Sequence, residues 1–374
     1  VMAHDIDIAE QFEKHLNSPK QTWLLGAGVS FPANIPLMYP LTTRVLELTK
    51  TKHFAKDAEA LLVLDFITDD CGRNSHIEHH LTHLGDLISI AERSHTGGIT
   101  IAGKQIAKEK LSEVHLALIG EIASTVRWGF KAAQTNAAGV VTQDAQIGTD
   151  GKPIVDISGH QRFVDAIFGA NRAGLDFVRT PVEFFTTNYD TLIEDALALA
   201  GIEFQDGFTG GGVGFWNMRN YTANSGTRAI VSKLHGSIDW YRSHSGNSNL
   251  LRVRHGDTYP GPGGTVMIYP QATKYANAQR DPFAEIFQRF RQRLSQGSDH
   301  VLLICGYSFG DEHINAEVEI AMSSSKNQLT IVAFVDEPNN ELSPTLRAWL
   351  REPWGSQLFI ASPKGIYLAR FFPS

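Results

Sequence analysis

The sequence predicts an α/β protein whose parallel sheet is covered by helices on both faces and interrupted by a large helical insertion. Two observations lead to this fold class. Short apolar runs alternate with helical patterns after residue 176, and residues 51–175 contain mainly helical patterns with few strand candidates. Alternation of strands and helices is typical of doubly wound sheets. We therefore expect a discontinuous core, residues 1–50 and 176–374, and a mostly helical inserted domain at 51–175.

The first fifty residues begin this core. Residues 8–16 carry apolar side chains at helical spacing. Residues 22–25 form a short apolar run that ends at Gly26, which indicates a buried strand entering a tight turn. A further helix is expected over 41–48, directly after Pro40.

The insertion is expected to be helical over 57–93, 104–134 and 158–175 because apolar residues recur there at helical spacing. Residues 139–157 are polar and rich in turn-forming residues. We interpret that stretch as an exposed loop or a small hairpin.

The second half supplies most of the predicted sheet. A helix over 191–200 is expected to open with a capping box, in which Thr191 is followed by Glu194 three positions later. A second helical stripe runs from Phe283 to Leu294. Apolar runs predict strands, and the fully apolar ones fit a parallel sheet covered on both faces; they lie at 182–186, 229–234, 266–269, 301–304 and 329–335. The expected core is therefore Rossmann-like.

The composition narrows the class of protein. The chain has 374 residues, of which 42% are hydrophobic and 20% charged, as in ordinary globular proteins. Its net charge of −7 argues against a general nucleic-acid binder, because neutralising phosphates needs clustered Lys and Arg. The arginines at 289, 291 and 293 are expected to form the solvated face of a helix.

Cysteine content and hydropathy suggest the compartment. Cys71 and Cys305 lie far apart in the sequence, so a disulfide framework is not expected. No apolar run approaches the ~18 residues of a membrane-spanning helix, and no signal peptide is recognisable near the N-terminus. We expect a cytoplasmic protein without membrane contact.

The first segment with chemical meaning is Gly26-Ala27-Gly28, which follows the first predicted strand. Glycine at such a turn lets backbone N–H groups approach a diphosphate without a Cβ clash. The dinucleotide-binding fingerprint has a third glycine where this chain has Phe31. An ordinary glycine turn is the alternative interpretation.

The second segment is Thr187-Asn188-Tyr189-Asp190, directly after the strand expected at 182–186. Ligands of α/β proteins bind at the carboxyl edge of the sheet, where Asn188 is expected. An uncharged amide there can orient a water or a ribose hydroxyl. Asp190 has two open interpretations: it contacts the ligand, or its charge favours the N-terminus of the following helix.

The third segment is Leu234-His235-Gly236-Ser237, at the end of another predicted strand. Histidine titrates near neutral pH, so His235 can accept a proton from a ribose hydroxyl or a water molecule. The chain has 15 histidines, and a structural role is the alternative for any one of them.

The fourth segment, Gly306-Tyr307-Ser308-Phe309-Gly310-Asp311, follows the strand expected at 301–304. Gly306 and Ser308 are expected to contact ribose or phosphate, and Asp311 suits the start of a helix. Asp336 follows the next predicted strand. It is expected to bind the adenosine ribose through its hydroxyls, with a surface position as the alternative.

Taken together and in this order, the four segments resemble the signature segments of the sirtuin (Sir2) superfamily. The resemblance implies that NAD is the substrate, that Asn188 orients its ribose or a water, and that His235 is the catalytic histidine. It also implies a dinucleotide site formed by Gly26, Ala27, Gly28, Ser30, Thr187, Asp190, Gly306, Tyr307, Ser308 and Asp336.

Two departures from the sirtuin pattern argue against protein deacylation. After Pro36, deacylases carry Asp-Phe-Arg, whereas this chain has Leu37-Met38-Tyr39. Deacylases also hold a structural zinc with two Cys-x-x-Cys pairs, which two lone cysteines cannot provide, so no zinc is expected. The stretch from Gly306 to Ile314 resembles instead the bacterial SIR2-like subgroup.

That subgroup implies an NAD hydrolase that acts as the effector of anti-phage defence by abortive infection, as a homo-oligomer paired with a HerA-type ATPase. Activity is expected to be latent, with the insertion as the contact surface that gates it. Two alternatives stay open: an NAD-dependent deacylase or ADP-ribosyltransferase, and a catalytically silent scaffold that senses NAD or ADP-ribose.

Two further patterns have less specific interpretations. His76, His79, His80 and His83 lie on neighbouring turns of a predicted helix, where they are either metal ligands or ordinary helix-surface histidines. Residues 207–215 are rich in glycine but lack the Gly-Lys-Ser/Thr ending of a P-loop. We expect them to form a mobile loop over the pocket.

Overall fold

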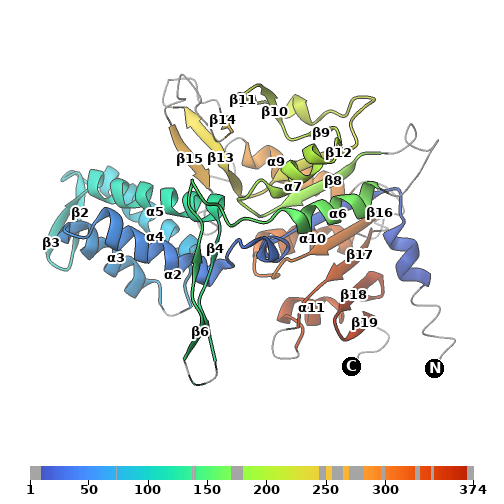
Figure 1. Cartoon of the computed structure of the whole chain (residues 1–374), viewed down its shortest axis with the longest axis horizontal. Helices are drawn as coiled ribbons and strands as arrows, with labels where there is room; N and C mark the ends of the chain where they lie inside the picture. The colour runs from blue at the N-terminus through green and yellow to red at the C-terminus, as the bar shows by residue number, and fades with distance from the viewer. Residues whose placement is uncertain are drawn as a thin grey trace.

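The computed structural model describes residues 10–72, 74–136, 138, 140–169, 180–243, 250–254, 264–268, 282–295, 300–324, 329–337 and 341–368. Figure 1 shows a large twisted sheet flanked by helices, with a separate group of helices beside it. Within these ranges, none of the helices has the length and apolar content needed to cross a membrane.

The central sheet has the strand order β19-β18-β17-β16-β1-β8-β12-β9 across the described residues. Only β19 pairs antiparallel; the other pairings are parallel. The strands are β1 (Gln21–Leu25), β8 (Val182–Thr186), β9 (Phe204–Gln205), β12 (Ala229–Lys233), β16 (His300–Cys305), β17 (Leu329–Phe334), β18 (Leu358–Ser362) and β19 (Gly365–Leu368). The strands expected at 22–25, 182–186, 229–234, 301–304 and 329–335 are confirmed.

The order of these strands reverses between β1 and β16. From β1 the chain builds outward through β8 to β12, and it then returns to the other side of β1 to build β16, β17 and β18. This is the 3-2-1-4-5-6 order of a Rossmann fold, whose ligands bind at the carboxyl edge where the order reverses. The predicted Rossmann-like sheet is confirmed, and its switch point lies between the first and fourth sequence segments.

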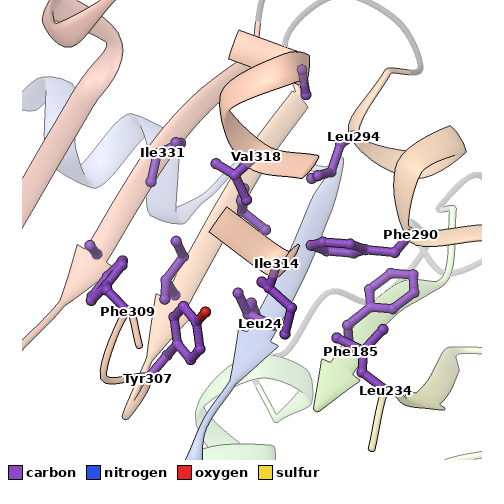
Figure 2. Close-up of a cluster of buried hydrophobic side chains, with 14 of the residues drawn as sticks. Leu24, Phe185, Leu234, Phe290, Leu294, Tyr307, Phe309, Ile314, Val318 and Ile331 are labelled. Atoms are coloured by element: carbon purple, nitrogen blue, oxygen red, sulfur yellow. The ribbon is translucent and has the colours of Figure 1, made fainter. Parts of the chain in front are cut away.

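Helices cover both faces of the central sheet because its strands are apolar on both sides. Figure 2 shows one face, on which strand residues such as Leu24 and Phe185 meet Phe290 and Ile314 of the helices. The helices on this face are α9 (Phe283–Leu294), α10 (Glu312–Ser323) and α11 (Pro344–Trp349). On the opposite face, α6 (Ser158–Phe168) and α7 (Leu192–Leu199) contribute to the second apolar layer. Burial on both faces is typical of parallel sheets.

A second, antiparallel sheet was not predicted. Its order is β10-β11-β14-β13-β15, and its strand β13 begins at Gly236, within the third sequence segment. The strand expected at 266–269 belongs to this sheet as β15, although Tyr269 lies outside the described residues. The mobile loop expected at 207–215 is wrong: that stretch forms the hairpin of β10 and β11. The strands are β10 (Phe208–Gly210), β11 (Val213–Trp216), β13 (Gly236–Ser243), β14 (Leu250–Val253) and β15 (Gly264–Ile268).

The separate group of helices is α2 (Met38–Leu48), α3 (Ala58–Asp70), α4 (Ile77–Arg93) and α5 (Lys108–Trp128), seen beside the sheet in Figure 1. We call these four helices the helical unit. They share one hydrophobic cluster, to which Val45, Leu64, Leu81 and Leu118 each contribute a fully buried side chain. A hairpin of β2 (Gly98–Ile101) and β3 (Lys104–Ala107) interrupts the stretch that was expected to be helical from residue 104.

The polar stretch at 139–157 forms short antiparallel pairs with the residues before it. Strand β4 (Phe130–Lys131) pairs with β7 (Gln146–Ile147), and β5 (Gln134–Thr135) pairs with β6 (Val141–Gln143). Figure 1 shows this arm projecting away from the sheet. Of the two expected forms, a loop or a hairpin, the hairpin is present.

The division into residues 1–50 with 176–374 and 51–175 stays a prediction. Hydrophobic packing joins α2, which precedes residue 51, to the helical unit through Leu41 and Val45. It joins α6, which precedes residue 176, to the sheet through Val164. The consequence for the site is that α6, counted with the insertion, lies against the core.

Candidate active site

The first and fourth sequence segments meet backbone to backbone at the switch point. The N–H of Gly26 donates to Cys305 O at 3.0 Å, and the N–H of Gly28 donates to Gly306 O at 2.8 Å. A Cβ on either Gly26 or Gly28 would collide with the backbone of Gly306. Gly306 itself has φ +64°, and its own Cβ would collide with the Val29 nitrogen.

These contacts change the expected role of the first glycines. Their N–H groups were expected to approach a diphosphate, but those of Gly26 and Gly28 are engaged within the protein. Glycine is required here because two loops approach each other closely. The two turns therefore pack against each other, backbone to backbone, at the carboxyl edge of β1 and β16.

Asn188 follows β8 and contacts the first of these two turns. Its side-chain amide donates to Gly26 O at 3.1 Å and to Ser30 Oγ at 3.0 Å. A carbonyl oxygen only accepts, so the contact with Gly26 O identifies the amide nitrogen. Asn188 Oδ1 then points elsewhere; it is buried and has no hydrogen-bond partner among the described residues. A buried unpaired acceptor suits a ligand hydroxyl or a water.

His235 follows β12, the strand next to β8, and is 3% exposed. Its Nε2 lies 3.0 Å from Oδ2 of Asp311, a carboxylate at the start of α10. Oδ1 of the same carboxylate accepts from the N–H of His313 at 3.0 Å and caps that helix. Because an ionised carboxylate only accepts, Nε2 carries the proton and Nδ1 is left as the basic nitrogen.

Asp190 makes a hydrogen bond to the backbone at the start of α7. Its carboxylate accepts from the N–H of Leu192 at 3.1 Å, and its carbonyl accepts from the ammonium of Lys233. Of the two interpretations left open, the geometry supports the helix N-terminus. The capping box predicted for Thr191 is wrong, because its hydroxyl donates to Asp195 Oδ2 at 2.6 Å.

Glu194, the other half of that expected capping box, is buried beside Lys233 instead. The Lys233 Nζ lies 3.3 Å from Glu194 Oε1, and both side chains are almost fully buried. Burial raises the pKa of Glu194 to about 7, although the nearby ammonium opposes this shift. The same Lys233 ammonium donates to Asp190 O, so this buried pair is connected to the segment that carries Asn188.

Tyr307 was expected to contact the dinucleotide, but its hydroxyl is engaged within the protein. It donates at 3.1 Å to the carbonyl of Asp311 or to Asn315 Oδ1. Burial raises the pKa of this phenol, with the charge of Asp311 adding to the effect. Tyr307 therefore supports the helix that holds Asp311.

The remaining expected dinucleotide contacts lie at or near the surface of the same edge. Ala27 and Ser308 are exposed, and Thr187 donates its N–H to Leu25 O at 3.0 Å. Asp336 follows β17, is exposed, and accepts from the N–H of Glu337 at 2.9 Å. None of these positions conflicts with ligand contact, and their role stays a prediction.

The structure adds a second histidine that the sequence did not indicate. His160 lies in the first turn of α6, is 5% exposed, and has its Nε2 3.5 Å from Ser30 Oγ. Burial lowers the pKa of His160, and the carboxylate of Asp190 opposes this shift. No local pattern marks His160, because it lies 130 positions from Ser30 in the sequence.

The helical unit holds both loops that carry the expected catalytic residues. The hydroxyl of Tyr189 donates to the carboxylate of Glu78 on α4. The guanidinium of Arg127 on α5 donates to the carbonyl of Ile238 at 2.9 Å. Tyr189 and Ile238 also belong to the hydrophobic cluster of this unit. Asn188 therefore directly precedes a residue anchored in the helical unit, and His235 is three residues before one.

The histidines at the start of α4 do not assemble a metal site in the part of the chain that the structure describes. His76 precedes the helix, and its ring lies 4.0 Å from that of His79. Burial lowers the pKa of His76 and of His80 to about 4. The His83 ring pairs with Asp70 at 3.0 Å.

A protein-family model matches part of this chain. Residues 182–358 match the family model of the SIR2-like domain, which covers the segments of Asn188, His235 and Asp311 but not the first glycine turn. No curated protein gave a significant match.

Solved structures give distant similarities. A Sir2 homologue in complex with ADP-ribose is 15% identical, with a TM-score of 0.32, over 85% of this chain and 80% of that one. Another Sir2 homologue, in complex with 2′-O-acetyl ADP-ribose, is 15% identical with a TM-score of 0.35, over 90% and 86% of the two chains. At such scores the fold assignment rests on the strand order and not on these superpositions. Residues 182–358 are thus similar to the SIR2-like domain family.

Proposed function

We propose that this protein hydrolyses the nicotinamide–ribose bond of NAD and releases nicotinamide and ADP-ribose. One observation carries the proposal. Asn188 and His235 are both buried at the carboxyl ends of adjacent parallel strands, and each is fixed by partners within the protein. Fixed polar groups of this kind favour a reaction in which substrate and water must be held in line.

In the proposed reaction, the dinucleotide lies along the carboxyl edge, with its nicotinamide ribose between these two side chains. The bond from C1′ to the pyridinium nitrogen breaks, and its electron pair leaves with neutral nicotinamide. The ribose passes through an oxocarbenium-like state, and a water adds to C1′. Asn188 Oδ1 accepts a hydrogen bond from a ribose hydroxyl or from that water.

His235 takes the proton that the attacking water loses. Nδ1 is the basic nitrogen of this ring, because Nε2 is committed to Asp311. The carboxylate of Asp311 then stabilises the imidazolium that forms. The balance is one NAD and one water giving nicotinamide, ADP-ribose and a proton.

Release of nicotinamide from NAD by the purified protein tests this proposal. We expect His235→Ala and Asn188→Ala to abolish turnover while the thermal unfolding transition persists. His95→Ala is the matched control, because His95 is exposed and distant from the site in sequence. Undiminished cleavage by His235→Ala would reject the assigned role.

The cellular part of the proposal follows from the resemblance to bacterial SIR2-like proteins. The protein would deplete NAD during phage infection as a homo-oligomer gated by a HerA-type ATPase. Assays with and without that ATPase measure the gating. Products that form only with an added acceptor would identify a transferase or deacylase. NAD binding by calorimetry, without cleavage in either assay, would identify a silent scaffold.

A further inference from the structure

His160 reaches the site because the N-terminal end of α6 is docked on the first glycine turn. The N–H of Asp156, two residues before α6, donates to Ala33 O at 3.1 Å. Ala33 ends the short 3-10 turn Phe31–Ala33 that follows Ser30. This docking places His160 beside the fully buried Ser30.

The donors and acceptors around Ser30 have a fixed direction. Gly26 O and Ser30 Oγ both lie within reach of Asn188 Nδ2, so each amide hydrogen has one acceptor. Ser30 Oγ thus accepts from Asn188, and its own hydrogen is left to donate. His160 Nε2 lies 3.5 Å away as the acceptor, at the long end of hydrogen-bond distances.

We propose that His160 is a positioning residue, which holds the Asn188 amide through the hydroxyl of Ser30. This inference rests on the proposed NAD hydrolysis. The order is Asn188 N–H to Ser30 Oγ, and Ser30 O–H to His160 Nε2. With both amide hydrogens committed, Oδ1 of Asn188 is held toward the ligand side.

The role requires a neutral His160 with a bare Nε2. Burial favours that state, because it lowers the pKa of the imidazole. Without this acceptor, the Ser30 hydroxyl is free to rotate, and its oxygen no longer presents one fixed lone pair to Asn188. A misplacement of about 1 Å in a positioning group can reduce turnover about 100-fold.

Two substitutions at His160 separate the acceptor from the bulk of the ring. Glutamine keeps an acceptor near the Nε2 position, whereas leucine fills the space without one. We expect His160→Leu to lower kcat for nicotinamide release about 10- to 100-fold with little change in KM. We expect the kcat of His160→Gln to be about 10-fold or more above that of His160→Leu. His115→Leu, a partly buried helix histidine on α5, is the control and keeps wild-type kcat.

Two kinetic outcomes would overturn the proposal. Wild-type kcat in His160→Leu would remove the positioning role. Equal losses of kcat in His160→Leu and His160→Gln would show that a hydrogen-bond acceptor at this position does not matter.

A second measurement is independent of NAD cleavage. The ¹⁵N spectrum of the histidine rings, assigned by comparison with His160→Gln, reports whether Nε2 carries a proton. We expect a bare Nε2 whose shift changes in Ser30→Ala, and a protonated or unresponsive Nε2 would refute the hydrogen-bond chain. If the wild-type protein released no nicotinamide, the proposed function would fail. The ¹⁵N spectrum would still show whether the hydrogen bonds from Asn188 through Ser30 to His160 exist.

Discussion

Nε2 of His235 and Oδ2 of Asp311 lie 3.0 Å apart, and the same carboxylate caps α10 through Oδ1. One side chain therefore connects the loop after β12 to the helix after β16. These loops lie on opposite sides of the switch point, because β16 and β12 flank β1 and β8. The orientation of the proposed base depends on a residue 76 positions away.

Replacing Asp311 with asparagine tests this dependence. Asparagine caps a helix about as well as aspartate, but its amide nitrogen would donate to His235 and favour the opposite tautomer. We expect kcat for NAD cleavage to fall about 10²- to 10³-fold while the circular dichroism spectrum is unchanged. The control is Asp57→Asn at the N-terminus of α3, which should keep kcat. Full activity in Asp311→Asn would contradict the role given to this pair.

The contact between the two glycine turns predicts a large effect of Gly306→Ala. The new Cβ would collide with the Val29 nitrogen, and φ +64° is unfavourable for alanine. We expect the free energy of unfolding to fall by at least about 2 kcal/mol. Gly103→Ala is the control, because Gly103 has φ +79° with no atom within 4 Å of its Cβ position. Urea unfolding compares the two, and equal losses would show that the collision is relieved at no cost.

The bond between Tyr189 and Glu78 predicts that the helical unit stabilises the Asn188 loop. A buried hydrogen bond to a charged group contributes about 1.5–3 kcal/mol, so Tyr189→Phe should lower the free energy of unfolding by that amount. Tyr39→Phe removes the hydroxyl of an exposed tyrosine and should change it by less than about 0.5 kcal/mol. Chemical denaturation measures both, and equal stability of the two variants would argue against a stabilising contact.

The raised pKa of Glu194 predicts a pH-dependent stability. The folded protein binds this proton up to about pH 7, whereas the unfolded chain releases it near its ordinary value of 4.5. The contribution of Glu194 is therefore fully present below pH 4.5 and is lost as pH rises to about 7. The free energy of unfolding of Glu194→Gln, measured relative to that of the wild type, should rise by about 3 kcal/mol between pH 4.5 and pH 8. A stability difference that does not change over this range would refute the assignment.

Five strands of the central sheet, β1, β8, β12, β16 and β17, could be predicted because each is a short and largely buried apolar run. Strands β9, β18 and β19 were not predicted; β9 has two residues and β19 is mostly exposed or half-buried. In the second sheet only β15 was predicted as a strand; β10, β11 and β14 are brief, and β10 and β11 include Gly210 and Gly214. Hairpin β2–β3 was missed because Ile101 and Ile106 are its only buried apolar side chains, and β3 was included in the helical pattern that begins at residue 104. Local periodicity does not indicate such pairings.

For the site, the sequence predicted that Asn188 and His235 each follow a strand, and in the structure these strands, β8 and β12, are neighbours. It did not reveal the partners that fix them. Asp311 was expected to begin a helix, but its second oxygen bonds a ring from another motif. His160 was counted with the insertion, because docking of α6 depends on contacts between residues distant in sequence. The Thr191 capping box failed because the Glu194 carboxyl is buried beside Lys233 and the Thr191 hydroxyl donates to Asp195 instead of capping the helix.

The anchoring of Tyr189 and Ile238 within the helical unit has a practical consequence for engineering. Excising that unit, or exchanging it for one from a relative, would expose apolar side chains that lie one residue after Asn188 and three residues after His235. Trimming the chain to its Rossmann portion is therefore expected to destabilise the segments that carry Asn188 and His235. Any replacement for the helical unit has to provide the same packing contacts for Tyr189 and Ile238.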